Sequence, residues 1–282
     1  MTVAQPPTVT EVVAVLEERY PSGWAEDWDR VGLVLGEPEA TVRRVLCVVD
    51  CVPETVEEAL RVDAQMIVAH HPLILRGVSS VAPTTYKGRV IHRLIRAGIA
   101  LYTAHTNADV ANPGVSDALA ARLRLVDLRP LRPVPGVPAA EGRGAGRVGR
   151  LPETLTLAEL TDLAAHALPA TAWGVRAAGA PGRHIRTVAV CGGAGDRYLA
   201  DAVAAGADAY LTADLRHHPA SEYVAEGGPA LLDAAHWATE RPWLDDLAAH
   251  VRGVLGIETV VSDVDTDPWT LHARSTTEEP QA

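Results

Sequence analysis

Residues 45–72, VLCVVDCVPETVEEALRVDAQMIVAHHP, contain the pattern that decides the fold class. Residues 45–49 form an apolar run rich in β-branched side chains, which is typical of a buried strand. Pro53 suits the first turn of a helix that is predicted to extend to residue 62. Residues 66–69 form a second buried strand, which ends at a His-His-Pro sequence. This strand–helix–strand order predicts parallel strands with helices on the faces of the sheet.

The same alternation continues along the chain. A helix near residues 87–97 stops at Gly98, and the strand 99–103 then leads into the sequence HTNAD at 105–109. In such sheets, the loops that leave the carboxyl ends of the strands build the functional site. The other predicted elements are a helix capped by Thr8, strands at 173–178, 187–190, 209–212, 230–232 and 258–261, and helices at 157–167 and about 242–255.

A stretch rich in proline, glycine and arginine divides the chain. Residues 128–150, LRPLRPVPGVPAAEGRGAGRVGR, are expected to form a linker or exposed loop. The N-terminal α/β half is then 1–127, the C-terminal α/β half is 151–264, and 265–282 is a flexible tail. Residues 45–72 and 188–219 share the order strand, turn, helix, strand and His-His-Pro. We therefore expect an α/β fold of two related halves, with central and mostly parallel sheets packed together.

Composition limits the functions that the chain can have. Its 282 residues contain 25 Lys+Arg and 36 Asp+Glu, which gives a net charge of −11. This balance argues against a nucleic-acid-binding protein, although bound metal ions can attract a small anion locally. Three cysteines form no disulfide framework, so a reducing cytoplasm is the expected location. The sequence predicts no signal peptide and no membrane span.

Three His/carboxylate clusters follow predicted buried strands. They are His70-His71, His105 with Asp109, and His236 with Glu240 in the sequence HWATE. Each alone also fits a structural role, such as a hydrogen-bonded strand end or a helix cap. Together, imidazole and carboxylate groups without thiolates suit Zn, Fe, Mn or Co. Five or six candidates exceed the roughly three protein ligands of one catalytic zinc, and they suit two ions about 3.5–4 Å apart that share a carboxylate.

Two further motifs have alternative interpretations. Asp214 with His217-His218 either supports the ligands or faces the substrate, or it is simply a solvated helix start. The sequence CGGAG at 191–195 either presents backbone N–H groups to a phosphate or forms a tight turn between a strand and a helix. It lacks the lysine and hydroxyl residue of a P-loop.

The set GWAEDWDRVGLVLG, IVAHHPL, YTAHTNAD, CGGAG, GADAYLTADLRHH and DAAHWATE, in this order, resembles the NIF-three-like proteins. These proteins are also known as GTP cyclohydrolase I type 2 homologues or dinuclear metal centre hexameric proteins. The resemblance extends from about Trp24 to Glu240, in the short form without a mid-chain insert domain. It implies two divalent metal ions per chain and a homohexamer. The implied ligands are His70, His71, Asp109, His236 and Glu240 as a bridge, and His105 is either a further ligand or a supporting group.

Two classes of function follow. The first is a dinuclear-metal-dependent hydrolase that resembles GTP cyclohydrolase I type 2, in which metal-activated hydroxide attacks a nucleotide or a similar small anionic substrate. His105, His217 or His218 is the candidate general acid or base, because imidazole titrates near neutral pH. The alternative is a non-catalytic metal-binding or regulatory hexamer that stores, delivers or senses metal ions.

Overall fold

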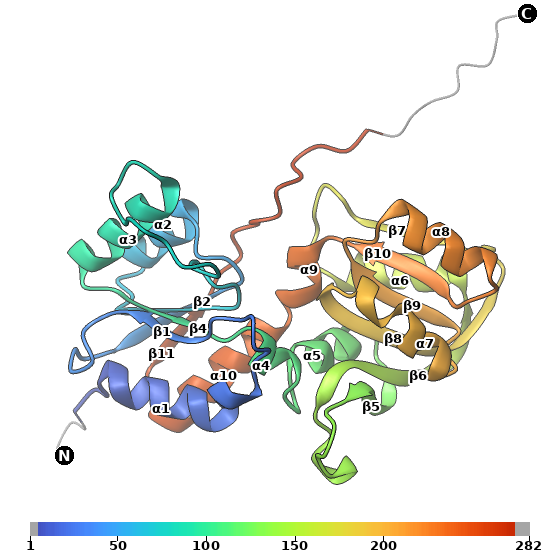
Figure 1. The fold of residues 1–282 in the computed structure, drawn as a ribbon, viewed down its shortest axis with the longest axis horizontal. Helices are drawn as coiled ribbons and strands as arrows, with labels where there is room; N and C mark the ends of the chain where they lie inside the picture. Colours follow the sequence, from blue (N-terminus) through green and yellow to red (C-terminus); the bar gives the residue numbers. More distant parts are fainter. Residues whose placement is uncertain (1–4, 274–282) are drawn as a thin grey trace, which may run out of the picture.

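A computed structural model describes residues 5–273. The first of its two sheets lies at the centre of one side of the molecule (Figure 1). The strand order is β1-β4-β3-β2-β11, and only the β1–β4 pair is antiparallel. Side chains of a strand alternate between its two faces. In β2, Val45 and Cys47 therefore pack in one core, whereas Leu46 and Val48 pack in the other. The strands are β1 (Gly32–Leu35), β2 (Arg44–Val48), β3 (Met66–Ala69), β4 (Ala100–Thr103) and β11 (Glu258–Val261).

Helices cover both faces of this sheet. One face carries α2 (Pro53–Arg61) and α3 (Tyr86–Ala97), and the other carries α1 (Val9–Arg19) and α10 (Trp243–Leu255) (Figure 1). The Thr8 capping box predicted for α1 is present, since Thr8 and Glu11 bond each other's backbone N–H groups. Gly98 ends α3 in the left-handed conformation, as expected.

The second sheet is mixed, with the order β5-β6-β8-β9-β10-β7. The central strands β8, β9 and β10 are parallel, and antiparallel strands complete the edges. The prediction of two α/β halves with parallel strands at their centres is therefore confirmed. The strands are β5 (Val126–Pro133), β6 (Gly144–Thr156), β7 (Val175–Ala178), β8 (His184–Ala194), β9 (Ala209–Ala213) and β10 (Ala230–Ala234).

Helices also flank the second sheet. α5, α6 and α9 pack with the core on one face, whereas α7 and α8 lie on the other face (Figure 1). None of the helices within residues 5–273 combines the length and the apolar character needed to cross a membrane. The remaining helices are α4 (Thr106–Asp109), α5 (Val115–Arg122), α6 (Leu157–Ala167), α7 (Leu199–Ala204), α8 (His217–Ala225) and α9 (His236–Glu240), with short 3₁₀ turns at Ser22–Trp24, Ala139–Glu141 and Asp196–Tyr198.

The prediction of a linker over residues 128–150 is wrong. The segment forms the antiparallel β5–β6 hairpin, which adds two strands to the second sheet. Prolines are tolerated because β5 is an edge strand, where a missing N–H group leaves no gap in the ladder. Arg147 of β6 is buried and paired with Asp117 of α5, and this ion pair joins the hairpin to the rest of the chain.

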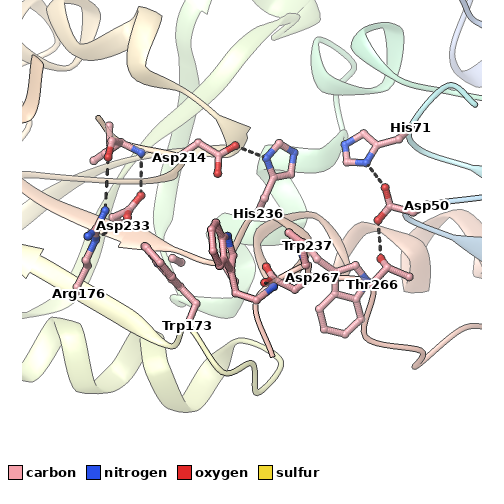
Figure 2. Close-up of a pocket in the computed structure, with 15 residues that line it drawn as sticks. Asp50, His71, Trp173, Arg176, Asp214, Asp233, His236, Trp237, Thr266 and Asp267 are labelled. Atoms are coloured by element: carbon pink, nitrogen blue, oxygen red, sulfur yellow. Dashed lines mark hydrogen bonds and ion pairs between the residues drawn. The ribbon is translucent and has the colours of Figure 1, made fainter. Parts of the chain in front are cut away.

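The predicted end of the C-terminal half, at residue 264, is also wrong. α10 and β11 return to the first sheet, where β11 pairs in parallel with β2. Residues 265–269 of the predicted tail are not loose, because Thr266 Oγ1 donates a hydrogen bond to Asp50 (Figure 2). Trp269 lies beside Trp173, with ring centroids 6.1 Å apart. Residues 274–282 of the predicted tail lie outside the described residues.

Candidate metal centre

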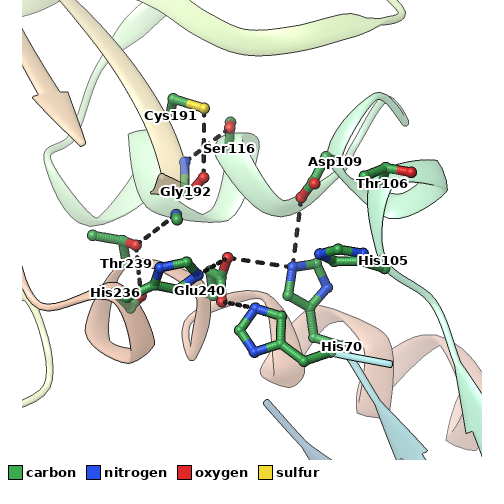
Figure 3. Close-up of polar contacts among 12 residues, drawn as sticks. His70, His105, Thr106, Asp109, Ser116, Cys191, Gly192, His236, Thr239 and Glu240 are labelled. Atoms are coloured by element: carbon green, nitrogen blue, oxygen red, sulfur yellow. Dashed lines mark hydrogen bonds and ion pairs between the residues drawn. The ribbon is translucent and has the colours of Figure 1, made fainter. Parts of the chain in front are cut away.

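The three predicted His/carboxylate clusters meet between the two sheets (Figure 3). His70 and His71 follow β3, Asp109 ends α4 just beyond β4, and α9 begins and ends with His236 and Glu240. All three segments leave the carboxyl ends of parallel strands, which is where α/β sheets place their sites. The structure therefore brings together every residue that the resemblance proposed as a ligand.

Glu240 lies at the centre of this cluster and is buried. Its Oε1 is 3.1 Å from His236 Nε2 and 3.4 Å from His70 Nε2, and its Oε2 is 3.0 Å from His71 Nε2. Asp109 Oδ1 lies 3.6 Å from His70 Nε2. One carboxylate thus faces three imidazole nitrogens, two from one half of the chain and one from the other.

The donor set fits bound cations. His70 Nε2 and Glu240 Oε2 are buried and make no hydrogen bond, although ring nitrogens and carboxylate oxygens are close together. Unsatisfied buried polar atoms are costly, so their presence points to a partner between them. Two sets hold ligand atoms within 4.8 Å of one another: His70, His71 and His105 form one, and His71, His236 and Glu240 form the other. The Nε2 of His71 can bind only one ion, but Glu240 faces nitrogens of both sets, so the cluster suits two neighbouring ions that share this carboxylate.

Each candidate imidazole is held in place through its other ring nitrogen. His71 Nδ1 lies 2.8 Å from Asp50 Oδ1, and His236 Nδ1 lies 2.7 Å from Asp214 Oδ2 (Figure 2). The acceptor for His70 Nδ1, 2.9 Å away, is the carbonyl oxygen of Ala104. A hydrogen bond donated by Nδ1–H leaves Nε2 with a free lone pair, which is the form that binds metals.

His105 follows the same pattern. Its Nδ1 lies 2.8 Å from Asp29 Oδ1, and the other oxygen of Asp29 accepts hydrogen bonds from the backbone N–H and side chain of Thr106. Asp29 lies in the loop before β1, far from His105 in sequence. Sequence reasoning missed Asp29 and Asp50 because neither has a fixed spacing from its histidine. Asp50 did carry one signal, since it directly follows a predicted strand.

Charge coupling within the cluster is strong. Burial acts to lower the pKa of His71 and His236, but the Glu240 carboxylate and the Nδ1 partners outweigh it and raise these pKa values to about 10 and about 11. Burial acts to raise the pKa of Glu240, but the imidazoles of His236, His71 and His70 hold it well below its ordinary value. A cation that binds these nitrogens would therefore compete with protons for them.

The CGGAG motif makes space for the site instead of forming a phosphate loop. Residues up to Ala194 belong to β8, and the N–H groups of Gly192 and Gly193 are already bonded to Ser116 Oγ and Thr239 Oγ1. Gly193 has a φ of +65°, and a Cβ atom there would lie 2.4 Å from Glu240 Oε1. The glycine thus allows the β8 backbone to pass directly beside Glu240.

The structure does not bring His217 and His218 to the ligands. Asp214, with a φ of 58°, directs the chain away from the site, so that both histidines begin α8 on its exposed surface. His217 lines a separate groove between α8 and β10. Of the predicted Asp214–His217–His218 group, only Asp214 reaches the site, where it supports His236.

Two cavities adjoin the cluster on opposite sides of His71 and His236. One, of about 240 Å³, contains the Nε2 side and is lined by His105, Asp109 and Glu240. The other, of about 380 Å³, contains Asp50 and Asp214 on the Nδ1 side (Figure 2). We call the first the metal-side cavity and the second the carboxylate-side cavity. Of these two cavities, the metal-side cavity is the one lined by Glu240.

Comparisons with known proteins show the family of this chain. A GTP cyclohydrolase 1 type 2 homolog of Streptomyces coelicolor is 53% identical over 274 residues, which cover 95% of this chain and 96% of that protein. A protein of the same name from Mycobacterium tuberculosis is 35% identical over 368 residues, and the match covers 93% of this chain and 97% of that protein.

Solved structures show the same fold. A Bacillus cereus protein related to NIF3 superposes with a TM-score of 0.88 at 24% identity and covers 95% of this chain and all of that one. Staphylococcus aureus SA1388 has a TM-score of 0.86 at 27% identity, with the same coverage. The sequence model of the Duf34/NIF3 (NGG1p interacting factor 3) family matches residues 7–268. The chain therefore belongs to the Duf34/NIF3 family.

Proposed function

We propose that this protein is a dinuclear-metal-dependent hydrolase that acts on a nucleotide or a similar small anionic substrate. The observation that carries the proposal is the convergence of three Nε2 atoms on Glu240, with two buried atoms of the cluster unpaired. His70, His71, Asp109, His236 and Glu240 would hold two divalent ions, and His105 would contribute to the first of them. Zn, Fe, Mn and Co all suit these donors.

The residues of the chain have distinct roles in this proposal. Bound divalent ions lower the pKa of water and stabilise developing negative charge. Glu240, whose oxygens face the Nε2 atoms of His70, His71 and His236, would be shared by the two ions. Asp50 and Asp214 orient His71 and His236. His105, held by Asp29 at the wall of the cavity, can exchange a proton with the substrate if it is not a ligand.

The relatives support hydrolysis of a purine nucleotide as the first reaction to test. Two of them are named GTP cyclohydrolase 1 type 2 homologs, and they align over nearly all of this chain. A cyclohydrolase adds water at C8 of a purine and cleaves the C8–N9 bond, which opens the imidazole ring. A phosphoesterase transfers a phosphoryl group to water and releases the alcohol. In both reactions, bound divalent ions would polarise the electrophile and lower the pKa of the attacking water.

The experiment compares metal-free and metal-reconstituted protein on GTP, GMP and p-nitrophenyl phosphate. We expect turnover only after reconstitution and loss of at least about a hundredfold of it in Glu240→Gln. Glu226→Gln changes an exposed carboxylate at the end of α8 and serves as the matched control. Reconstituted protein that exchanges metal but hydrolyses none of the three would contradict the proposal and favour a metal-binding or regulatory role.

A further inference from the structure

We propose that Arg197 and Trp28 form the substrate-recognition rim of the metal-side cavity. In this proposal, Arg197 binds an anionic group such as a phosphate, and Trp28 stacks on a planar heteroaromatic ring. The inference rests on the proposed function, because it concerns the molecule that approaches the same site. The ligand class is therefore a nucleoside phosphate, with its ring and its anion held by different halves of the protein.

The size of the cavity shows that recognition must extend to its rim. Its volume of about 240 Å³ lies below the roughly 300–1,000 Å³ of most small-molecule pockets. Only the reacting part of a nucleotide fits inside, so the rest must contact the residues at the opening. Trp28 comes from the loop before β1, whereas Arg197 belongs to the 3₁₀ turn after β8. The opening is thus bounded by both halves of the chain.

Arg197 is the one arginine at this cavity among the described residues. Among the described residues that line it, no other arginine or lysine occurs, and the carboxylates are those of Asp109 and Glu240. A guanidinium binds phosphate through two parallel hydrogen bonds, which adds direction as well as charge. An anionic substrate group that extends beyond the metal ligands would therefore bind the guanidinium of Arg197.

The present partner of Arg197 can be exchanged. Arg197 Nη2 lies 3.2 Å from Glu26 Oε1, and both side chains are nearly half exposed. Exposed ion pairs of this kind contribute little to stability, because water screens the charges. The guanidinium also lies over the Tyr198 ring, with Cζ 4.7 Å from the ring centroid. This contact would hold Arg197 at the rim when a phosphate replaces Glu26 as its partner. A phosphate would thus compete with Glu26 at low cost.

Trp28 supplies an aromatic surface on the other side of the opening. Its side chain is 48% exposed, although it lies 5.9 Å from the His105 ring in an edge-on arrangement. Trp28 lines the metal-side cavity, and every nucleobase presents a flat face on which an aromatic ring can stack.

The carboxylate-side cavity does not suit the same ligand. It contains Asp50, Asp214, Asp233 and Asp267 but only one guanidinium, Arg176, which is already paired with Asp233. Its negative charge would repel a phosphate. Charge thus distinguishes the two cavities, and it assigns the anion to the side where Arg197 lies.

The test measures the affinity of the metal-reconstituted protein for GMP and for guanosine by isothermal titration calorimetry. We expect wild-type protein to prefer GMP, and Arg197→Met to lose about tenfold in GMP affinity while guanosine binding is unchanged. Arg197→Lys should recover only part of this loss, because a lysine cannot form two parallel bonds. Arg216→Met, which breaks the ion pair between Arg216 and Asp196 outside the cavity, is the matched control.

Two other variants separate the two contacts. Trp28→Ala should weaken GMP and guanosine equally, by about tenfold, so that the preference for GMP is retained. Glu26→Gln should strengthen GMP binding a few-fold, because it removes the competing carboxylate. A damaged fold cannot produce this gain, so the result stays interpretable even if another variant is unstable. Metal content and thermal unfolding are measured for every variant.

Three results would overturn the proposal: a preference for GMP that survives Arg197→Met, guanosine affinity that is unaffected by Trp28→Ala, or wild-type protein that binds neither ligand. The first would mean that the metal ions alone hold the phosphate. Nucleotide binding without any turnover would support the recognition rim and contradict the proposed hydrolase activity. Turnover of p-nitrophenyl phosphate without nucleotide affinity would support the hydrolase activity and contradict the recognition rim.

Discussion

His71 Nε2 lies 3.0 Å from Glu240 Oε2, although His71 follows a strand of the first sheet and Glu240 ends a helix that packs on the second. The candidate metal centre therefore exists only where the two halves meet. A cation bound there would join them, and its removal would leave a buried carboxylate among imidazoles.

Metal binding is expected to stabilise the whole chain through Glu240. At a free metal concentration one hundred times the dissociation constant, binding to the native state alone adds about 2.7 kcal/mol to the free energy of unfolding. Glu240→Gln should remove most of this increment, and Glu226→Gln should retain it. Thermal unfolding with and without a chelator measures the difference. Equal stabilisation of both variants by metal would argue against Glu240 as a ligand.

The Asp50 carboxylate is expected to control metal affinity without contacting the metal. It accepts the hydrogen bond of His71 Nδ1, and Thr266 Oγ1 donates to its other oxygen. Asp50→Asn should weaken metal binding by about 10–100-fold, which is the usual effect of changing such an outer partner. Thr266→Val should have a smaller effect in the same direction. Competition with a fluorescent chelator measures both, and unchanged affinity in Asp50→Asn would refute the role.

Gly193 should not tolerate a side chain. An added Cβ would lie 2.4 Å from Glu240 Oε1 and 2.9 Å from His236 Nε2, and the φ of +65° is itself unfavourable for alanine. Gly193→Ala is expected to lower metal stoichiometry and to cost about 1–3 kcal/mol of stability. Gly182→Ala is the control, because nothing lies within 4 Å of its added Cβ. Normal metal content in Gly193→Ala would show that the backbone is not confined there.

The pH dependence of metal binding follows from the raised imidazole pKa values. In the metal-free protein, the folded-state pKa values of His71 and His236, about 10 and about 11, exceed the roughly 6.5 of an unfolded histidine. Their contribution to stability is thus fully present below about pH 6.5 and is lost as the pH rises toward the folded values.

A cation must displace these protons, so metal affinity should rise with pH throughout this range. Calorimetry in buffers of different ionisation enthalpy measures the number of protons released. We expect a net release upon binding at neutral pH. Binding without proton release would show that the nitrogens are unprotonated before the metal arrives.

The parts of the fold that local patterns encode were predictable from the sequence. β3 has the bounds that its apolar run indicates, and α6 agrees with the predicted 157–167. The β5–β6 hairpin was not predictable, because the prolines of β5 are tolerated at the edge of the sheet and Arg147 of β6 is buried through its distant partner Asp117. The return of β11 to the first sheet depends on long-range pairing with β2, which no local pattern records.

The same division applies to the site. The histidines and Glu240 stand at strand ends with recognisable spacing, so their convergence could be expected. Asp29 reaches His105 across 76 positions, and Asp50 reaches His71 across 21. The position of Asp50 after a strand and of Asp29 in the sequence GWAEDWDRVGLVLG marks both as candidates, but only the folded chain shows which histidine each one contacts.

The most direct test of the central claim is the number of metal ions in the purified protein, measured by elemental analysis after growth without added metal and after reconstitution. The account predicts about two ions per chain in the wild type and fewer in Glu240→Gln. A wild-type protein that contains no metal and takes up none of Zn, Fe, Mn or Co would contradict it.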